Sequence, residues 1–265
     1  MPIVFSAIVP HPPVLIPEIG KDNAVHLAET VKALKTLEQE LYAAKPESLV
    51  IIGPDDTIMP ESFSINLAAD YTAEFKEFGD YAIQLHHRSD YLSVQEIRAA
   101  DESNKSVPIV LTSNQSLGHA FGVPLFFLAQ HIKDVPIIPI TYSGQEYQKN
   151  FDFGVFLHGQ LSNINKRFAV IASVDLSNKL TKEAPGGYSP SAEAFDQAVV
   201  DALKKHDSAA LLGIDPYLAQ ESGEAGVRAI AVLLGILKEI NVAPVFMAYE
   251  KPFGVGYATF NYQFK

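Results

Sequence analysis

The feature that most constrains this chain is a series of short, almost wholly apolar runs separated by segments with helical periodicity. The clearest runs lie at residues 3–9, 49–52, 136–141 and 168–172. Runs of this length and composition are typical of strands that are buried on both faces of a largely parallel sheet. The sequence therefore predicts a single α/β domain over residues 1–265, with a mostly parallel or mixed central sheet and helices on both faces.

The segments between these runs complete the expected pattern. Helices are predicted at residues 23–42, 91–100, 123–132, 147–164, 192–205 and 224–240. Phe63, Ile65 and Leu67 alternate with polar residues, which predicts a half-buried antiparallel strand. Further strands are expected at residues 107–111, 242–249 and 255–262, the last two as a pair. The longest predicted loop, interpreted as a mobile lid or as a surface connection, covers residues 178–190.

Charge and cysteine content exclude several classes of protein. The net charge of −11 argues against a nucleic acid or an anionic membrane surface as partner, because phosphate binding needs clustered Lys and Arg. The chain has no Cys, which excludes disulfides and thiolate metal sites. Its apolar runs are far shorter than the ~20 residues of a membrane span. We therefore expect a soluble, cytoplasmic protein.

Polar side chains follow several of the predicted strands. His11 is the most distinctive, because it stands in the stiff turn Pro10-His11-Pro12-Pro13 directly after the first strand. The carboxyl ends of parallel strands lie at one edge of a sheet, so side chains that follow different strands can converge there. The other candidates at strand ends or helix starts are Asp55, Asp56, His119, Asp175, Asn178 and Glu224.

Histidines and carboxylates on one rim suit a divalent metal ion with open coordination positions. Each residue also has a simpler interpretation. The aspartates can cap local turns, Glu224 can interact with the N-terminus of its own helix, and His119 can be an ordinary loop residue. Their joint placement is what favours a functional site.

The chain resembles the LigB-like catalytic chains of the class III extradiol ring-cleavage dioxygenases, and the related Memo group. The resemblance runs nearly from end to end and rests on six motifs in order. They are Pro10-His11-Pro12-Pro13, Ile52-Gly53-Pro54-Asp55, Leu117-Gly118-His119, the run Ala172 to Leu180, the run Ser222 to Arg228, and Pro252-Phe253-Gly254-Val255-Gly256-Tyr257.

This resemblance implies a non-haem Fe(II) held by two His and one Glu. His11 matches the first histidine ligand and Glu224 matches the glutamate, whereas Asp55 occupies the place of the second histidine. His119 matches an active-site histidine that helps to position the substrate and dioxygen. Asn178 stands where the family has its main acid/base histidine.

The two departures alter the expected chemistry. With Asp55 as a ligand, the site becomes harder and more negative, which favours Mn(II), Mg(II) or Zn(II) more than the usual ligand set does. The Asn178 amide does not exchange a proton near neutral pH, and general acid–base catalysis typically contributes ~10²–10⁴-fold. We therefore expect ordinary catechol cleavage to be slow.

Three functions remain open from the sequence. The first is an extradiol-type oxidoreductase that uses dioxygen on a small catechol-like aromatic, with a homo-oligomeric assembly expected. The second is a diverged metal-dependent enzyme such as a hydrolase. The third is a non-catalytic, Memo-like binding protein, which needs no metal at all. Elemental analysis separates them, because they imply bound iron, bound zinc or manganese, and no metal, respectively.

Overall fold

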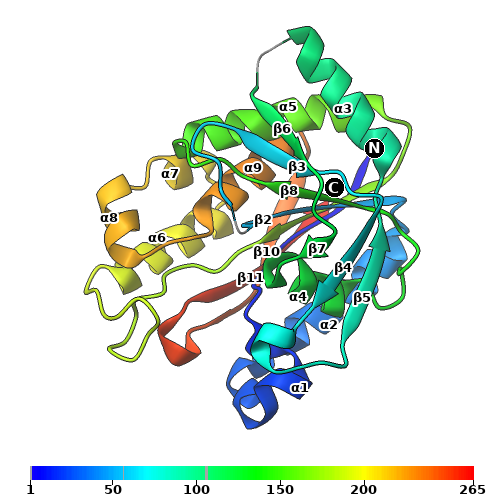
Figure 1. The fold of residues 1–265 in the computed structure, drawn as a ribbon. Helices are drawn as coiled ribbons and strands as arrows, with labels where there is room; N and C mark the ends of the chain where they lie inside the picture. Colours follow the sequence, from blue (N-terminus) through cyan, green and yellow to red (C-terminus); the bar gives the residue numbers. More distant parts are fainter. Residues whose placement is uncertain (1, 56, 105–106) are drawn as a thin grey trace.

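A mixed eight-stranded sheet forms the centre of the computed structural model, which describes residues 2–55, 57–104 and 107–265. Figure 1 shows helices above and below this sheet. The strand order is β10-β11-β1-β9-β2-β8-β3-β6. The strands are β1 (Ile3–Val9), β2 (Ser48–Gly53), β3 (Phe63–Asn66), β6 (Ile109–Thr112), β8 (Ile137–Thr141), β9 (Phe168–Ser173), β10 (Val242–Glu250) and β11 (Tyr257–Phe264).

The middle of the sheet is parallel and its ends are mixed. Strands β1, β9, β2 and β8 run parallel to one another, as the apolar runs predict. The pair β10 and β11 is antiparallel, and β3 is antiparallel to β8. The predicted antiparallel strand around Phe63 is therefore present, but all four of its residues are buried instead of half-buried. The burial follows because β3 lies between two strands and its Phe63 ring stacks on Phe153 at 3.9 Å.

Two apolar cores cover the two faces of the sheet, and β2 shows how they arise. Val50 and Ile52 pack into one core, and Leu49 and Ile51 pack into the other, because successive side chains of a strand point to opposite faces. The first core contains residues of α3 (Tyr91–Asn104), α5 (Tyr147–Asn163), α6 (Ala192–Lys204) and α9 (Val227–Leu237). The second contains residues of α2 (Ala28–Ala44) and α4 (His119–Leu128). The fold class predicted from the sequence is thus confirmed.

Helices α5 and α9 pack closely through two glycines. A Cβ on Gly154 would lie 2.0 Å from the carbonyl oxygen of Val232, and one on Gly235 would lie 2.1 Å from that of Phe151. Such distances exclude any side chain at these two positions. The contact fixes α9 against α5, the two helices that carry Arg228 and Tyr147 of the candidate site.

Several short elements are absent from the sequence-based prediction. A second sheet has the order β5-β4-β7 and packs against α4. Its strands are β4 (Asp70–Glu74), β5 (Gln84–Arg88) and β7 (Ser116–Leu117), and the additional short helices are α1 (Pro17–Gly20), α7 (Ser208–Leu212) and α8 (Pro216–Ser222). No helix within the described ranges has both the length and the apolar character needed to cross a bilayer.

Two helix starts differ from the prediction in a way that matters for the site. The apolar helix expected from residue 123 begins at His119, because Gly118 adopts an extended N-cap conformation directly before it. The helix expected from residue 224 begins at Val227, because Gly223 has a left-handed backbone (φ 64°) that ends α8 and leaves Glu224 in a turn. The loop at residues 178–190 is irregular, as expected, and backbone hydrogen bonds such as Ser189 N–H to Lys179 O (2.9 Å) hold it.

Candidate metal and substrate site at the carboxyl rim of the sheet

Three neighbouring parallel strands end at one rim and carry the candidate residues. Val9 of β1 is paired in register with Ser173 of β9, and this is the last residue pair of the two strands. His11 and Asp175 are each two residues beyond this pair, so they leave the sheet side by side. Asp55 follows β2, the neighbour of β9 on its other side, and is half-buried. Asp56 lies outside the described residues.

His11 is buried and both of its ring nitrogens face oxygen atoms. Its Nδ1 lies 3.0 Å from Ser173 Oγ, and its Nε2 lies 3.6 Å from Asp175 Oδ2. The backbone N–H of His11 also donates to Asp175 Oδ1 at 3.1 Å. Two separate contacts therefore hold Asp175 against His11, although the residues are far apart in the sequence.

The hydroxyl of Ser173 determines the tautomer of His11. Ser173 Oγ donates its single hydrogen to the carbonyl oxygen of Ala120 at 2.5 Å, so it must accept at its contact with His11. The hydrogen of a neutral His11 ring is therefore on Nδ1, and the lone pair of Nε2 points towards Asp175. A histidine whose Nδ1–H is bonded and whose Nε2 is available has the usual arrangement of a metal ligand.

His119 stands beside His11, as the convergence argument predicts. The two ring centroids are 5.6 Å apart in an edge-to-face arrangement. On its other side, His119 meets the Phe78 ring at 5.2 Å, and its Nδ1 lies 3.9 Å from Glu77 Oε1. Because His119 is the first residue of α4, its position is set by the helix start at Gly118. The His119 side chain is partly exposed.

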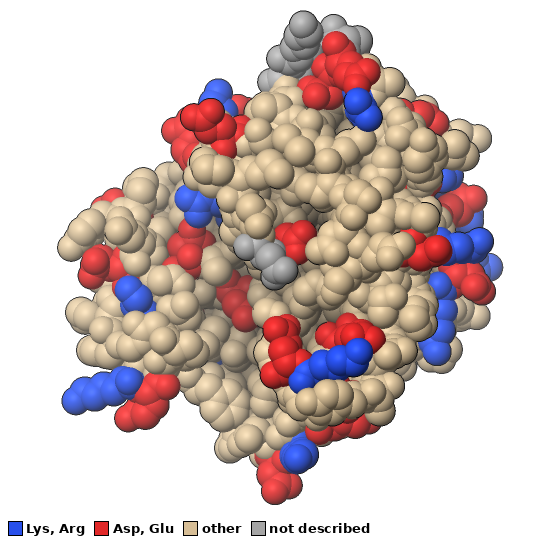
Figure 2. Space-filling view, in the orientation of Figure 1, with Lys and Arg blue, Asp and Glu red and all other residues tan. Residues whose placement is uncertain are grey.

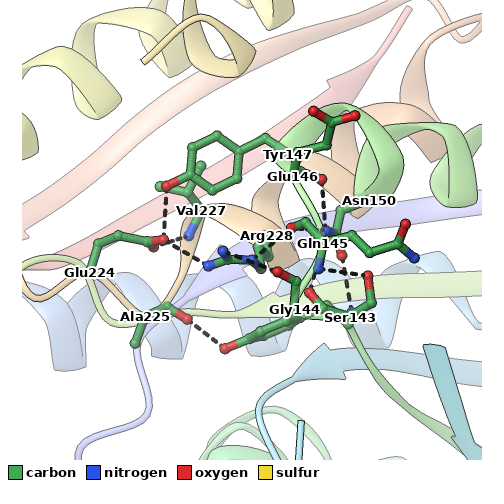
Figure 3. A network of polar contacts seen from close by, with 11 residues as sticks. Ser143, Gly144, Gln145, Glu146, Tyr147, Asn150, Glu224, Ala225, Val227 and Arg228 are labelled. Atoms are coloured by element: carbon green, nitrogen blue, oxygen red, sulfur yellow. Dashed lines mark hydrogen bonds and ion pairs between the residues drawn. The ribbon is translucent and has the colours of Figure 1, made fainter. Parts of the chain in front are cut away.

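Glu224 belongs to a different network, shown in Figure 3. Its Oε1 accepts hydrogen bonds from the Tyr147 hydroxyl at 2.8 Å and from Arg228 Nη1 at 3.1 Å. Its Oε2 accepts from the backbone N–H of Val227 at 3.0 Å, which satisfies a donor at the start of α9. Burial, together with the charge of Glu224, raises the pKa of Tyr147, so this hydroxyl stays a donor to the carboxylate.

The same network continues to the segment that follows β8. Arg228 Nε donates to the carbonyl oxygen of Gln145 at 3.0 Å, and the Tyr142 hydroxyl donates to that of Ala225 at 2.6 Å. A cavity of about 680 Å³ borders Glu224 and Arg228 and is lined from α5, α8 and the turns beside them. Glu224 therefore faces the α5–α9 side of the molecule, and its carboxylate is neutralised by an arginine.

Asn178 is packed into a tight backbone pocket. A Cβ on Gly186 or on Gly223 would lie 2.2 Å from Asn178 Oδ1, so the carboxamide lies directly against both glycines. The Asn178 backbone donates to the Ser222 carbonyl at 3.3 Å, and its carbonyl accepts from Gly186 N–H at 3.0 Å. Its Oδ1 is buried and has no hydrogen-bond partner within the part of the chain that the structure describes. Asn178 thus joins the loop after β9 to the turn before Glu224.

The structure brings some of the predicted residues together and shows that one of them is engaged with other partners. His11 and His119 are adjacent, whereas Glu224 is engaged with Tyr147 and Arg228. Across residues 2–55, 57–104 and 107–265, no group of three or more His, Asp or Glu side chains is arranged to hold one metal ion. The ligand set of His11, Asp55 and Glu224 therefore stays a prediction.

Asp175 is one of the candidates that the sequence places at strand ends, but the family resemblance gives it no role at the metal. It follows its strand at the same offset as His11 follows β1, but this is visible only once the register of β1 and β9 is known. Burial, with the negative charge of Asp175 as a further cause, raises the pKa values of Tyr142 and Tyr257. Two neutral tyrosines thus lie within electrostatic reach of Asp175.

Charge on this side of the molecule is mainly acidic near its centre. Figure 2 shows Asp and Glu side chains across this face, with Lys and Arg lying mainly towards its periphery. This distribution agrees with the net charge of −11. It favours a cation over an anion as the charged partner of the rim.

Comparisons with known proteins identify relatives along nearly the whole chain. A profile of the family described as "Catalytic LigB subunit of aromatic ring-opening dioxygenase" matches residues 6–260. Protein CA_C1420 of Clostridium acetobutylicum is 27% identical over 259 residues, covering 94% of this chain and 55% of that protein. The 2,3-dihydroxyphenylpropionate/2,3-dihydroxicinnamic acid 1,2-dioxygenase of Klebsiella pneumoniae is 23% identical over 177 residues, covering 62% of this chain and 54% of that protein.

The chain thus spans about half the length of these curated relatives. Among solved structures, the uncharacterized protein JW3007 from Escherichia coli K12 superposes with a TM-score of 0.64 at 13% identity, covering 97% of this chain and 99% of that one. This likeness supports the fold. The relation to the Memo group stays a prediction.

Proposed function

The chain belongs to the family of catalytic LigB subunits of aromatic ring-opening dioxygenases, and from this premise we propose that it is a metal-dependent oxidoreductase that opens a small catechol-like ring with dioxygen. The observation that carries the proposal is the setting of His11. Its Nδ1–H is bonded to Ser173, its Nε2 lone pair faces the rim, and His119 stands 5.6 Å away. We place the enzyme in the cytoplasm, acting on a free small molecule.

The residues at the rim fit a divalent cation. In this proposal His11 would offer Nε2 and Asp175 a carboxylate, Ser173 holds the imidazole at Nδ1, and Asp55 follows the adjacent strand β2. The family resemblance implies Fe(II), whereas the carboxylates also suit Mn(II) or Zn(II). When bound, the cation supplies Lewis acidity and, in the case of Fe(II), the redox chemistry that reaction with dioxygen requires.

The protein side chains then have separate tasks. His119 lies beside His11 and next to the Phe78 ring, so it is suited to orient an aromatic ring and to hold or release a proton at its imidazole. Asn178 cannot replace the acid/base histidine of the family, because an amide does not titrate near neutral pH. We therefore propose that turnover is slow and depends on His119.

The proposal is tested by loading the purified full chain anaerobically with Fe(II) and mixing it with catechol or 2,3-dihydroxyphenylpropionate in the presence of oxygen. The second substrate is chosen from the name of the Klebsiella pneumoniae relative. Oxygen uptake and the absorbance of a yellow ring-opened product report cleavage. We expect slow, iron-dependent uptake that His11→Ala abolishes. Uptake that His11→Ala leaves unchanged, or no uptake by iron-loaded wild-type protein, would contradict the proposal.

The carboxylates at the rim favour a second candidate, a metal-dependent hydrolase that uses a cation-bound water. Asp55 and Asp175 both follow strands at this rim, and hard oxygen ligands of this kind suit redox-inert cations. Elemental analysis of the protein as purified separates the candidates. Stoichiometric iron supports the oxidoreductase, zinc or manganese supports the hydrolase, and a metal-free protein supports the Memo-like binding role.

A further inference from the structure

We propose that Asp175 is the carboxylate that binds the cation together with His11, and that Glu224 is a structural residue that holds the start of α9. This inference rests on the proposed function only in assuming that a divalent cation occupies the rim at His11. It assigns the metal a different carboxylate from the one that the family resemblance implies.

The contacts of His11 determine which ring nitrogen carries its hydrogen. Ser173 Oγ gives its hydrogen to Ala120 O, and His11 Nδ1 gives its hydrogen to Ser173 Oγ. Nε2 of the neutral ring then has a lone pair and no hydrogen. It faces Asp175 Oδ2, which is also an acceptor, so a positive charge between the two atoms would be stabilised by both.

The two acceptors are separated by a distance that suits a shared cation. His11 Nε2 and Asp175 Oδ2 are 3.6 Å apart, too far for a strong hydrogen bond. Metal bonds to His nitrogen and Asp oxygen are each about 2.0–2.2 Å, so two ligands of one cation can be up to about 4 Å apart. The observed separation therefore accommodates a cation between the two atoms without any movement of the side chains.

Asp175 is held in place against His11. Its Oδ1 accepts from the His11 backbone N–H at 3.1 Å, which directs Oδ2 towards the imidazole. The side chain is only 19% exposed, so water screens its charge incompletely. Among the described residues, the His11 ring is the basic group that lies against the Asp175 carboxylate, with Nε2 3.6 Å from Oδ2.

Glu224 is in the opposite situation. Its side chain is 5% exposed, and three donors satisfy it, one of them the guanidinium of Arg228. If Glu224 turned towards a cation at the rim, it would give up its contacts with the half-buried Arg228 guanidinium and with the Val227 N–H at the start of α9. Separating a partly buried ion pair and leaving a helix N-terminus without its acceptor are both costly, so this exchange is unfavourable.

The test compares two carboxylate-to-amide variants of the full chain by calorimetric titration with Mn(II). Asp175→Asn keeps an acceptor for the His11 backbone N–H but removes the negative charge. Glu224→Gln likewise keeps an acceptor for the donors around position 224 and removes the negative charge. Asp152→Asn, an exposed position on α5, is the matched control. We expect Asp175→Asn to weaken Mn(II) binding by about tenfold or more. We expect Glu224→Gln to keep the affinity within about twofold of wild type, while it lowers the midpoint of thermal unfolding by about 3 °C or more.

The outcomes separate this inference from the function on which it rests. Mn(II) binding that Glu224→Gln abolishes and Asp175→Asn leaves at the control level overturns the assignment of Asp175, yet it leaves the metal-dependent function intact. Binding that neither variant changes also overturns the assignment. A wild-type chain that binds neither Mn(II), Fe(II) nor Zn(II) overturns the proposed function and this inference together.

Discussion

Ser173 fixes the orientation of His11: the 3.0 Å contact between Ser173 Oγ and His11 Nδ1 leaves Nε2 facing Asp175. The residues are 162 positions apart in the sequence, and the parallel pairing of β1 and β9 brings them together. Because Ser173 also donates to Ala120 at the start of α4, one hydroxyl connects the His11 turn to the helix that carries His119.

Removing this hydroxyl is expected to weaken metal binding without unfolding the protein. In Ser173→Ala the His11 ring loses the acceptor that selects its tautomer, and loss of such an outer contact typically costs about 10–100-fold in metal affinity. Titration with Mn(II) measures the effect. Ser162→Ala, an exposed position on α5, serves as the control. An affinity equal to that of the control would show that Ser173 does not orient the ligand.

The two neighbouring histidines are expected to differ in their effect on metal binding. His11→Ala removes the proposed ligand and should abolish measurable binding, whereas His119→Ala should leave the affinity within about tenfold of wild type, because His119 faces the substrate. Elemental analysis after anaerobic loading and gel filtration measures retained metal. Equal loss of metal in both variants would contradict these different roles.

Restoring the two family histidines is expected to raise the rate of ring cleavage and to lower the free energy of unfolding. General acid–base catalysis contributes about 10²–10⁴-fold, so Asp55→His combined with Asn178→His should cleave catechol at least about tenfold faster than wild type. The imidazole at position 178 meets Gly186 and Gly223, and overpacking of this kind typically costs about 1–3 kcal/mol of unfolding free energy.

Oxygen uptake and thermal unfolding measure the two effects on the same preparations. The control variant combines Asp55→His with Asn178→Leu, which adds bulk at position 178 without a titratable group. A double variant that is no faster than this control would show that the missing acid/base at position 178 does not limit the reaction.

A buried histidine outside the site predicts how stability depends on pH. His87 on β5 is 6% exposed, and its Nδ1 has no hydrogen-bond partner within the described residues. Burial, with smaller contributions from His86 and Lys133, lowers the pKa of His87 from 6.5 to about 4. The unfolded chain therefore binds this proton at higher pH than the folded chain. The contribution of neutral His87 to the unfolding free energy is complete above pH 6.5 and is lost as the pH falls towards 4.

We accordingly expect the unfolding free energy of the wild type to fall between pH 7 and pH 4 by an amount that includes up to about 3 kcal/mol from His87. Urea unfolding at several pH values measures this loss. His87→Leu should show a smaller loss over the same range, whereas His26→Gln, at an exposed position, should match the wild type. An unchanged slope in His87→Leu would contradict the lowered pKa.

The sequence predicts the central strands well because their apolar runs carry a strong local signal. Residues 3–9 form β1 with the bounds that the sequence suggests, and β2, β8 and β9 differ by a residue or two at their ends. The strands β4 and β5 are missed, because their many polar and charged residues give no apolar run. The start of α9 is misplaced because the left-handed turn at Gly223 is a single-residue feature within a favourable helical pattern.

The site is less predictable than the fold because it depends on register. His11 and His119 can be singled out from their motifs, and the structure brings them together. Asp175 is also a candidate from the sequence, but its contact with His11 cannot be predicted, because it depends on the pairing of Val9 with Ser173, two residues in distant segments. Likewise, the hydrogen bonds of Glu224 come from Tyr147 and Arg228, and a motif does not show that these donors already occupy its carboxylate.

The most direct test of this account is the anomalous diffraction of crystals of the full chain loaded with Mn(II). The account predicts a single strong peak at the rim, within about 2.2 Å of both His11 Nε2 and Asp175 Oδ2, with Glu224 still bonded to Arg228. A peak bonded to Glu224 and distant from Asp175, or no peak at His11, would contradict it.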